Sequence, residues 1–193
     1  NENGYVSIII KNTTYKSVIA FYDLTGTEIF RRYGHKNYAI CTAISNNNEY
    51  LAIGEIDYSG TILKSYITII SVEKAQEDPK NSIVNTYESE NGEIITNIKY
   101  QDKENAICMF TNYVQKVGVS SNEKIYEITD NDMFVDINLK DSIAVIDKQS
   151  SGLFSYEFEM LLKSTINKSE NLYILDSDLP KMVVVGGNNI ALN

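Results

Sequence analysis

The chain has few of the residues that mark several functional classes. Among its 193 residues are one histidine, two cysteines, two prolines and no tryptophan. One histidine excludes zinc sites that use two or more. Two cysteines do not build a disulfide framework in a chain of this size. Cys41 and Cys108 both lie in apolar strand patterns, so we expect two separate buried thiols.

Long apolar runs and a basic surface are missing as well. No run of about 20 apolar residues occurs, so we expect no membrane span within the chain. The net charge of −9 and the pI near 4.7 disfavour binding to a phosphate backbone, and we expect no nucleic-acid partner. Arg31 and Arg32 are no exception, because adjacent residues of a strand point to opposite faces.

Strand patterns dominate what is present. Short runs of β-branched and aromatic residues alternate with turn residues along the whole chain, whereas no long segment has a 3.6-residue apolar period. The best helix candidate, residues 73–76, is too short to count. The sequence therefore predicts an all-β fold.

A turn followed by a short strand around an alanine recurs four times, at Ala52, Ala106, Ala144 and Ala191. The spacing of roughly 40 to 55 residues is typical of β-propeller blades. A β-sandwich is the rival interpretation, since it also has short strands and regular turns. The repeated alanine favours the propeller, because small side chains suit strands that crowd near the axis. We expect these four alanines to be buried at equivalent places.

The strand pattern divides the chain into about three full blades with a partial blade at each end. The first blade lacks its first strand, the fourth ends with a strand at Leu172–Leu175, and the fifth stops after two strands. We therefore expect one incomplete propeller domain over residues 1–193. Its blades span approximately residues 1–33, 38–90, 93–130, 133–176 and 181–193.

Three residues have predicted structural roles in turns. Asp23 follows Tyr22 and precedes Leu24-Thr25-Gly26, where its carboxylate can cap the turn. Gly34-His35 resembles the Gly-His pair of WD repeats, and Asp57 would be the turn aspartate of that motif. The resemblance implies a hydrogen bond between His35 and Asp57 and no catalytic role for either.

Other polar clusters do not indicate a catalytic, metal-binding or phosphate-binding site. The acidic residues at 130–136 and 176–178 lack the glycine and final glutamate of an EF-hand loop, so we interpret them as solvated turns. The glutamates around Asn91-Gly92 lie at a hairpin tip, where no burial would raise a carboxyl pKa. No helix pattern follows Gly186-Gly187, which excludes a phosphate loop. We expect no catalytic residue, cofactor or metal.

Segments 45–52, 81–84 and 187–192 resemble the WD/PQQ-like propeller domain of the clostridial "domain of unknown function 5711" proteins. The resemblance covers essentially the whole chain. It implies a propeller without known activity, further blades beyond residue 193, and an N-terminal membrane anchor that holds the domain outside the cytoplasm. A cytoplasmic location is the alternative. No functional residue can be transferred from this family.

Together these observations predict a bacterial, non-catalytic propeller that binds or scaffolds a protein partner. Two alternatives stay open. One is a propeller enzyme whose site lies in blades outside this chain. The other is an extracytoplasmic glycan-binding module, because exposed tyrosines can stack on sugar rings as well as anchor a protein.

Overall fold

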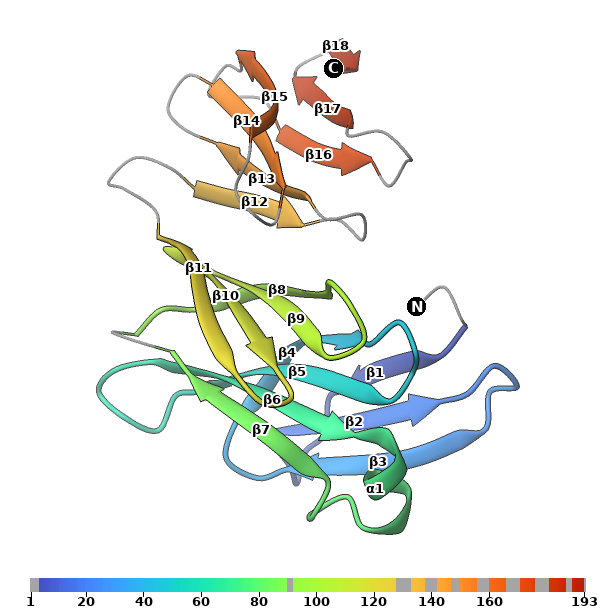
Figure 1. Ribbon diagram of the computed structural model, residues 1–193. Coiled ribbons are helices and arrows are strands. Elements are labelled where there is room, and N and C mark those ends of the chain that lie inside the picture. The colour runs from blue at the N-terminus through green and yellow to red at the C-terminus, as the bar shows by residue number, and fades with distance from the viewer. Residues whose placement is uncertain are drawn as a thin grey trace. The chain divides into compact units, whose positions relative to one another are not determined.

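A computed structural model provides the structure of the protein (Figure 1). The chain divides into two compact units, residues 1–110 with 115–123 and residues 111–114 with 124–193, and each unit is described by itself. From residue 128 onward only the backbone of the strands is described. The described residues are 4–89, 92–127, 133–137, 142–146, 150–155, 160–165, 171–175, 181–186 and 189–192.

Five sheets follow one another along the chain, and each contains only strands that are consecutive in sequence. This arrangement confirms the all-β propeller fold with incomplete sheets at both ends. The first sheet holds β1 (Val6–Ile10), β2 (Ser17–Tyr22) and β3 (Glu28–Gly34), and the second holds β4 (Tyr38–Ile44), β5 (Tyr50–Asp57), β6 (Lys64–Ser71) and β7 (Ile83–Glu88). The third holds β8 (Ile95–Tyr100), β9 (Asn105–Phe110), β10 (Tyr113–Gly118) and β11 (Asn122–Glu127). The fourth holds β12 (Met133–Ile137), β13 (Ser142–Ile146), β14 (Ser150–Ser155) and β15 (Met160–Thr165), and the fifth holds β16 (Asn171–Leu175), β17 (Lys181–Gly186) and β18 (Asn189–Leu192).

The described core lies between the first, second and third sheets. Strands β2, β5 and β9 are buried over almost their whole length, as expected for strands covered on both faces. The rings of Phe21 and Phe30 stack at 5.2 Å, and Tyr5 stacks on Phe21 at 5.8 Å. Buried side chains of the first two sheets and of the helix that follows β6 form one cluster, which contains Ile19, Phe21, Phe30, Leu51, Ile53, Ile70, Val72 and Ala75.

The second and third sheets approach each other closely at Gly54. A Cβ atom there would lie 2.7 Å from the Sγ of Cys41 and 3.1 and 3.2 Å from side-chain carbons of Ile95 and Ile98. No side chain fits in this space without displacing its neighbours. Glycine at position 54 therefore permits the packing of β8 on β4 and β5.

Strand β1 occupies the place that the second strand has in a four-stranded sheet. It lies beside β4, as β5 lies beside β8. Ser17 is the first residue of β2 and lies across the hairpin from the last residue of β1. Its hydroxyl donates to the carbonyl of Asn37, which lies just before β4. The end of β1 thus meets the start of β4, so the two strands run in opposite directions. In the first sheet, β1, β2 and β3 therefore correspond to β5, β6 and β7 of the second.

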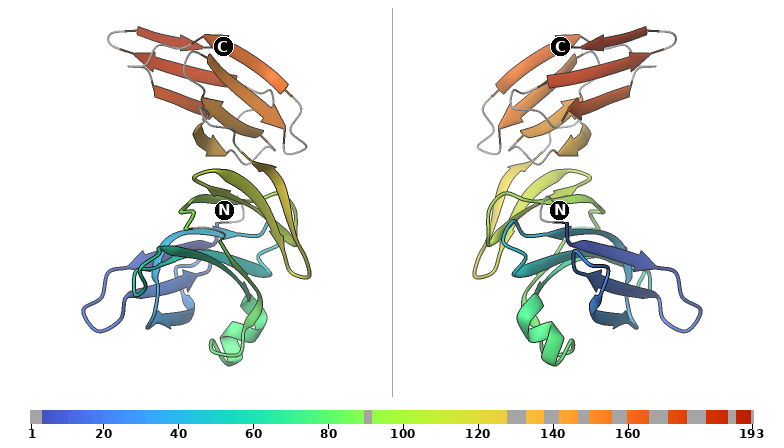
Figure 2. Two further views of the ribbon diagram at one scale, coloured as in Figure 1. Left: turned by 90° about the vertical axis from the view of Figure 1, so that its left-hand side faces the viewer. Right: turned by 90° about the vertical axis from the view of Figure 1, so that its right-hand side faces the viewer.

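A short helix, α1 (Val72–Glu77), follows β6 at the end of the second sheet (Figures 1 and 2). Its N-cap is Ser71, whose Oγ accepts a hydrogen bond from the backbone N–H of Lys74 at 3.4 Å. Val72 and Ala75 are buried against the core. Residues 73–76, which the sequence pattern left as too short to count, therefore do form a helix, with one further residue on each side. No helix in the described part of the chain has the length and hydropathy needed to cross a bilayer.

The predicted end of the fourth blade is wrong. Residues 172–175 do not end the fourth sheet but belong to β16, which pairs with β17 and opens the fifth. The strand that ends the fourth sheet is β15. The sequence between β14 and β15 is Tyr-Glu-Phe-Glu, which alternates like a strand and lacks turn residues, so it gives no sign of the boundary between these two strands.

Because β16 opens the fifth sheet, the last alanine of the repeat does not lie where it was predicted. Ala52, Ala106 and Ala144 lie on β5, β9 and β13, the second strand of each sheet. Ala191 lies on β18, the third strand of its sheet, so it is not equivalent to the other three. Ala52 and Ala106 are fully buried. The side chains of Ala144 and Ala191 lie outside the described residues, as do the acidic residues at 130–132 and 176–178.

Candidate functional site: a tyrosine-rich surface

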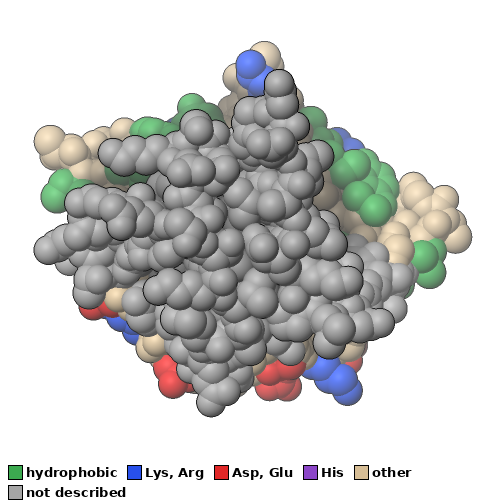
Figure 3. All heavy atoms as spheres, turned by 90° about the horizontal axis from the view of Figure 1, so that it is seen from above, with side chains coloured by type: hydrophobic (Ala, Val, Ile, Leu, Met, Phe, Trp, Pro, Cys, Tyr) green, Lys and Arg blue, Asp and Glu red, His purple; other side chains and the backbone are tan. Residues whose placement is uncertain are grey.

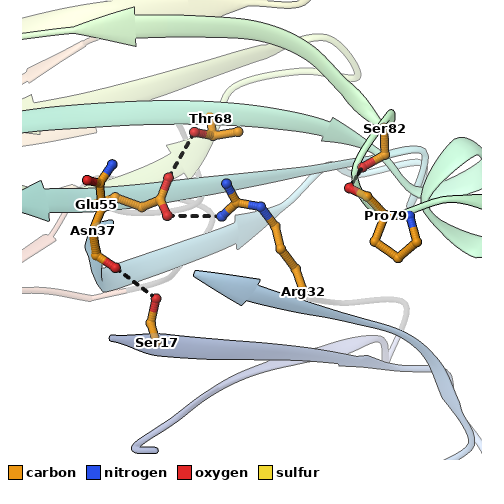
Figure 4. Close-up of polar contacts among 7 residues, drawn as sticks. All are labelled: Ser17, Arg32, Asn37, Glu55, Thr68, Pro79 and Ser82. Carbon is orange, nitrogen blue, oxygen red and sulfur yellow. Dashed lines mark hydrogen bonds and ion pairs between the residues drawn. The ribbon is translucent and has the colours of Figure 1, made fainter. Parts of the chain in front are cut away.

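A buried ion pair joins the first two sheets (Figure 4). Arg32 on β3 reaches Glu55 on β5, with 2.9 Å between Nη1 and Oε1. The other carboxylate oxygen of Glu55 accepts a hydrogen bond from the hydroxyl of Thr68 at 3.0 Å. Glu55 is only 3% exposed. Because both of its oxygens have partners, Glu55 stabilises the contact between the sheets and is a poor candidate for proton transfer.

The connection from β3 to β4 is fixed next to this pair. A Cβ atom at Gly34 would lie 2.6 Å from the Oγ of Ser17, so glycine lets β2 and β3 approach here. The same hydroxyl donates to the carbonyl of Asn37 at 3.1 Å, a contact that Figure 4 also shows. These contacts hold the backbone on both sides of His35.

Two side-chain caps fix the neighbouring loops. The Oδ1 of Asn12 accepts hydrogen bonds from the backbone N–H groups of Thr14 and Tyr15, at 2.7 and 3.0 Å. The Oδ1 of Asp57 accepts one from Ser59 at 2.8 Å. This hydrogen bond is the main cause of the lowered pKa of the Asp57 carboxyl. Both loops are therefore held by local Asx turns.

The three fixed segments carry a group of aromatic rings. The ring of Tyr15 lies 4.7 Å from that of Tyr33 and meets the ring of His35 edge-on at 4.8 Å. The ring of Tyr38 meets that of Tyr58 edge-on at 5.7 Å. The Nζ of Lys16 lies over the Tyr38 ring at 5.3 Å from its centre. We call Tyr15, Lys16, Tyr33, His35, Tyr38 and Tyr58 the tyrosine-rich surface.

Several of these rings are open to solvent. Tyr33, Tyr38 and Tyr58 are 47%, 42% and 55% exposed. Tyrosine combines a large apolar ring with a polar hydroxyl and loses little conformational entropy on binding, so it is enriched at interfaces. Chemically, this surface can stack on a flat ligand, donate hydrogen bonds and contact apolar side chains.

The surrounding charge is mixed. In the space-filling view, acidic and basic side chains lie next to one another along one edge of the described surface (Figure 3). The described ion pairs with both side chains in contact with solvent include Arg31 with Glu28 and Lys64 with Glu88. The net charge of −9 therefore does not produce a uniform negative field over the described part of the chain.

The predicted structural residues have different surroundings. Asp23 caps its turn, because its Oδ1 accepts from the N–H groups of Thr25 and Thr27 at 2.8 and 2.9 Å. His35 belongs to the tyrosine-rich surface and Asp57 precedes Tyr58 of that surface, but the described residues show no hydrogen bond between His35 and Asp57. The Asp57 carboxylate is bound by its own loop, and the His35 ring packs on Tyr15. The expected WD-type pair is therefore not formed.

The cysteines are free thiols, as expected. Cys108 is fully buried, and burial raises the pKa of its thiol well above the ordinary value. Cys41 keeps part of its surface in solvent, yet burial raises its thiol pKa to about 12. Neither thiol is a nucleophile at neutral pH. Within the described residues no group of three His, Cys, Asp or Glu side chains could hold a metal ion.

Sequence reasoning missed both the ion pair and the grouping of the tyrosines. Arg32 and Glu55 are 23 residues apart, and nothing local to either residue indicates the other. The four tyrosines come from two loops and two strand ends. Their individual positions at turn boundaries gave only the general expectation that some of them are exposed.

Solved structures similar to this chain are β-propellers. The Cps50 (Swd1) propeller domain of Myceliophteria thermophila is 10% identical with a TM-score of 0.63, over 99% of this chain and 61% of that one. The propeller domain of the trilobed protease from Pyrococcus furiosus, with an open velcro topology, is 11% identical with a TM-score of 0.62, over 99% and 63%. NirN, a dihydro-heme d1 dehydrogenase in complex with DHE, is 7% identical with a TM-score of 0.63, over 96% and 41%.

At these identities the likeness shows the fold alone. The chain spans less than two thirds of the length of each of these three structures. No curated protein matches the sequence. The model of a family of unknown function, DUF5711, matches residues 1–188. The chain therefore belongs to the DUF5711 family, and its described sheets give that family a β-propeller architecture.

Proposed function

We propose that this chain is a non-catalytic propeller module that binds a protein partner through the tyrosine-rich surface. The observation that carries the proposal is the exposure of Tyr33, Tyr38 and Tyr58 on segments fixed by the Asn12, Ser17 and Asp57 hydrogen bonds. Rings that are already ordered cost little entropy when a partner covers them. In this proposal residues 1–193 belong to one propeller domain, and the blades act as a scaffold for the surface.

The test places a photo-crosslinking amino acid at Tyr58 in the cells that produce the protein. We expect a discrete cross-linked protein band, because residue 58 would lie inside the interface. The matched control places the same amino acid at Leu24, which is 70% exposed and lies on a different turn. Equal cross-linking at both positions, or none at 58, would contradict the proposal.

A glycan ligand is the second candidate, favoured by the exposed tyrosine rings. A glycan array distinguishes the two. Binding of a defined sugar that is lost in Tyr33→Ala and Tyr58→Ala, with an unchanged unfolding midpoint, would favour the glycan module. The extracytoplasmic, membrane-tethered location implied by the family resemblance stays a prediction, as does an enzymatic role in blades outside residues 1–193.

A further inference from the structure

A groove lies at the opposite end of β4 from the tyrosine-rich surface. It encloses about 360 Å³ between the start of β1, the turn from β4 to β5 and helix α1. Tyr5, Ile29 and Val72 supply an apolar wall, and Tyr50 lies beside them. Val72 is almost fully buried, while Tyr5, Ile29 and Tyr50 keep part of their surface in solvent.

Two carboxylates flank this apolar wall. Glu49 and Glu73 both line the groove, and both side chains are exposed. Among the described residues neither carboxylate has a hydrogen-bond or ion-pair partner. No lysine, arginine or histidine lines the groove. Its negative charge is therefore uncompensated, in contrast to the paired glutamates at positions 28, 55 and 88.

The walls of the groove are held in place by hydrogen bonds. The Oδ1 of Asn47 accepts hydrogen bonds from the hydroxyl of Ser45 at 2.8 Å and from the N–H of Glu49 at 3.3 Å. The carbonyl of Glu49 accepts one from the N–H of Val72 at 2.8 Å. The turn that carries Glu49 is thus tied to the helix that carries Glu73.

We infer that this groove binds a lysine or arginine side chain of a partner polypeptide. The aliphatic stem of such a side chain can cover Tyr5, Ile29 and Val72 while its charged head stays near Glu49 and Glu73 and in water. Charge complementarity selects a basic segment, because an acidic or neutral one would leave both carboxylates unpaired. This site is separate from the tyrosine-rich surface, and its occupancy does not depend on the function proposed there.

The test uses nuclear magnetic resonance on the ¹⁵N-labelled chain and three capped pentapeptides. The first has one lysine between two isoleucines, with glycine at both ends. The second has norleucine in place of lysine, which removes the charge, and the third has diaminobutyric acid, which shortens the stem. We expect the lysine peptide to shift the amide signals of Glu49, Tyr50 and Glu73. The norleucine and diaminobutyric acid peptides should bind at least about twofold more weakly, on the scale of exposed ion pairs and small apolar contacts.

Variants of the chain complete the test. Glu49→Gln and Glu73→Gln keep the size of each side chain, and each should raise the Kd of the lysine peptide about two- to fivefold. Glu77→Gln is the matched control, because Glu77 is exposed on the same helix and does not line the groove. Its Kd should equal that of the parent chain. Added salt should weaken binding of the lysine peptide and leave the norleucine peptide unaffected.

Three results would overturn the inference. The first is equal binding of the lysine and norleucine peptides. The second is unchanged binding in the Glu49→Gln, Glu73→Gln double variant. The third is signal changes located outside the groove, or no signal changes at millimolar peptide. None of these results bears on cross-linking at Tyr58, so the two proposals can fail independently.

Discussion

The two faces of strand β3 place adjacent arginines in opposite environments. Arg31 pairs with Glu28 of the same strand, and about a third of each side chain is exposed. Arg32 pairs with Glu55 of the next sheet, where the glutamate side chain is 4% exposed and also binds Thr68. The same two residue types thus form a local surface pair on one face and a contact between sheets on the other.

The difference teaches that the surroundings of an ion pair decide its contribution to stability. Water screens the charges on the exposed face, so breaking that pair leaves two solvated ions. On the buried face the charges have lost their water, so the removal of one partner leaves the other without compensation. The experiments below break or sharpen this contrast.

The largest effect is expected for Glu55→Ala. Its removal leaves the Arg32 guanidinium and the Thr68 hydroxyl without their acceptor, at a cost of about 3–5 kcal/mol. The measurement is the free energy of unfolding in urea. Glu28→Ala is the matched control on the exposed face, and equal midpoints for the two variants would contradict the contrast.

A smaller loss of stability is expected for a change at a buried apolar residue. Ala106 on β9 is fully buried, so Ala106→Leu should overpack this layer and cost roughly 1–3 kcal/mol. Lys103→Leu introduces the same side chain in the exposed turn before β9 and should change stability by no more than about 0.5 kcal/mol. If thermal unfolding gives the two variants the same midpoint, the alanine does not mark a tightly packed position.

Replacement of the whole buried network should cost little. In the triple variant Arg32→Met, Glu55→Met, Thr68→Val, no charge or hydroxyl is left without a partner. Apolar replacements of buried ion pairs are often neutral or stabilising, so we expect stability within about 1 kcal/mol of the parent chain. A triple variant as unstable as Glu55→Ala would show that the network is needed for packing and not only for charge compensation.

The smallest effect is expected for Arg31→Ala, which should leave the unfolding midpoint unchanged at physiological salt. Its consequence should appear in titration instead. The hydrogen bond from Arg31 lowers the pKa of the Glu28 carboxyl, and the variant should return it toward the ordinary value. A group with a lowered folded-state pKa stabilises the fold above its unfolded pKa and loses this contribution as the pH falls through the folded value.

The measurement is a carbon-13 titration of the Glu28 carboxyl between about pH 2 and 7, the range in which glutamate titrates. Glu104, an exposed glutamate in another turn, serves as the reference. An unchanged Glu28 titration in the variant would show that the Arg31 contact does not persist in solution.

Most of the fold could be predicted because its signals are local. Turns, alternating strands and the cap at Asp23 are each encoded within a few residues. The error at residues 172–175 has the same origin, since the sequence between β14 and β15 contains no turn residues and gave no local signal. The Arg32–Glu55 pair and the tyrosine-rich surface join segments from different sheets and loops, and a single sequence does not reveal such contacts. The predicted His35–Asp57 bond failed because each side chain has a nearer partner.

The packing around Gly54 makes the reactivity of the Cys41 thiol sensitive to separation of the second and third sheets. Burial raises the pKa of the Cys41 thiol to about 12, so almost all of it is protonated at pH 7 while the sheets are closed. A thiol reagent should therefore label Cys41 slowly, and labelling should become faster when the second and third sheets separate. A larger residue at position 54 should displace the neighbouring side chains and increase the rate at which Cys41 is labelled.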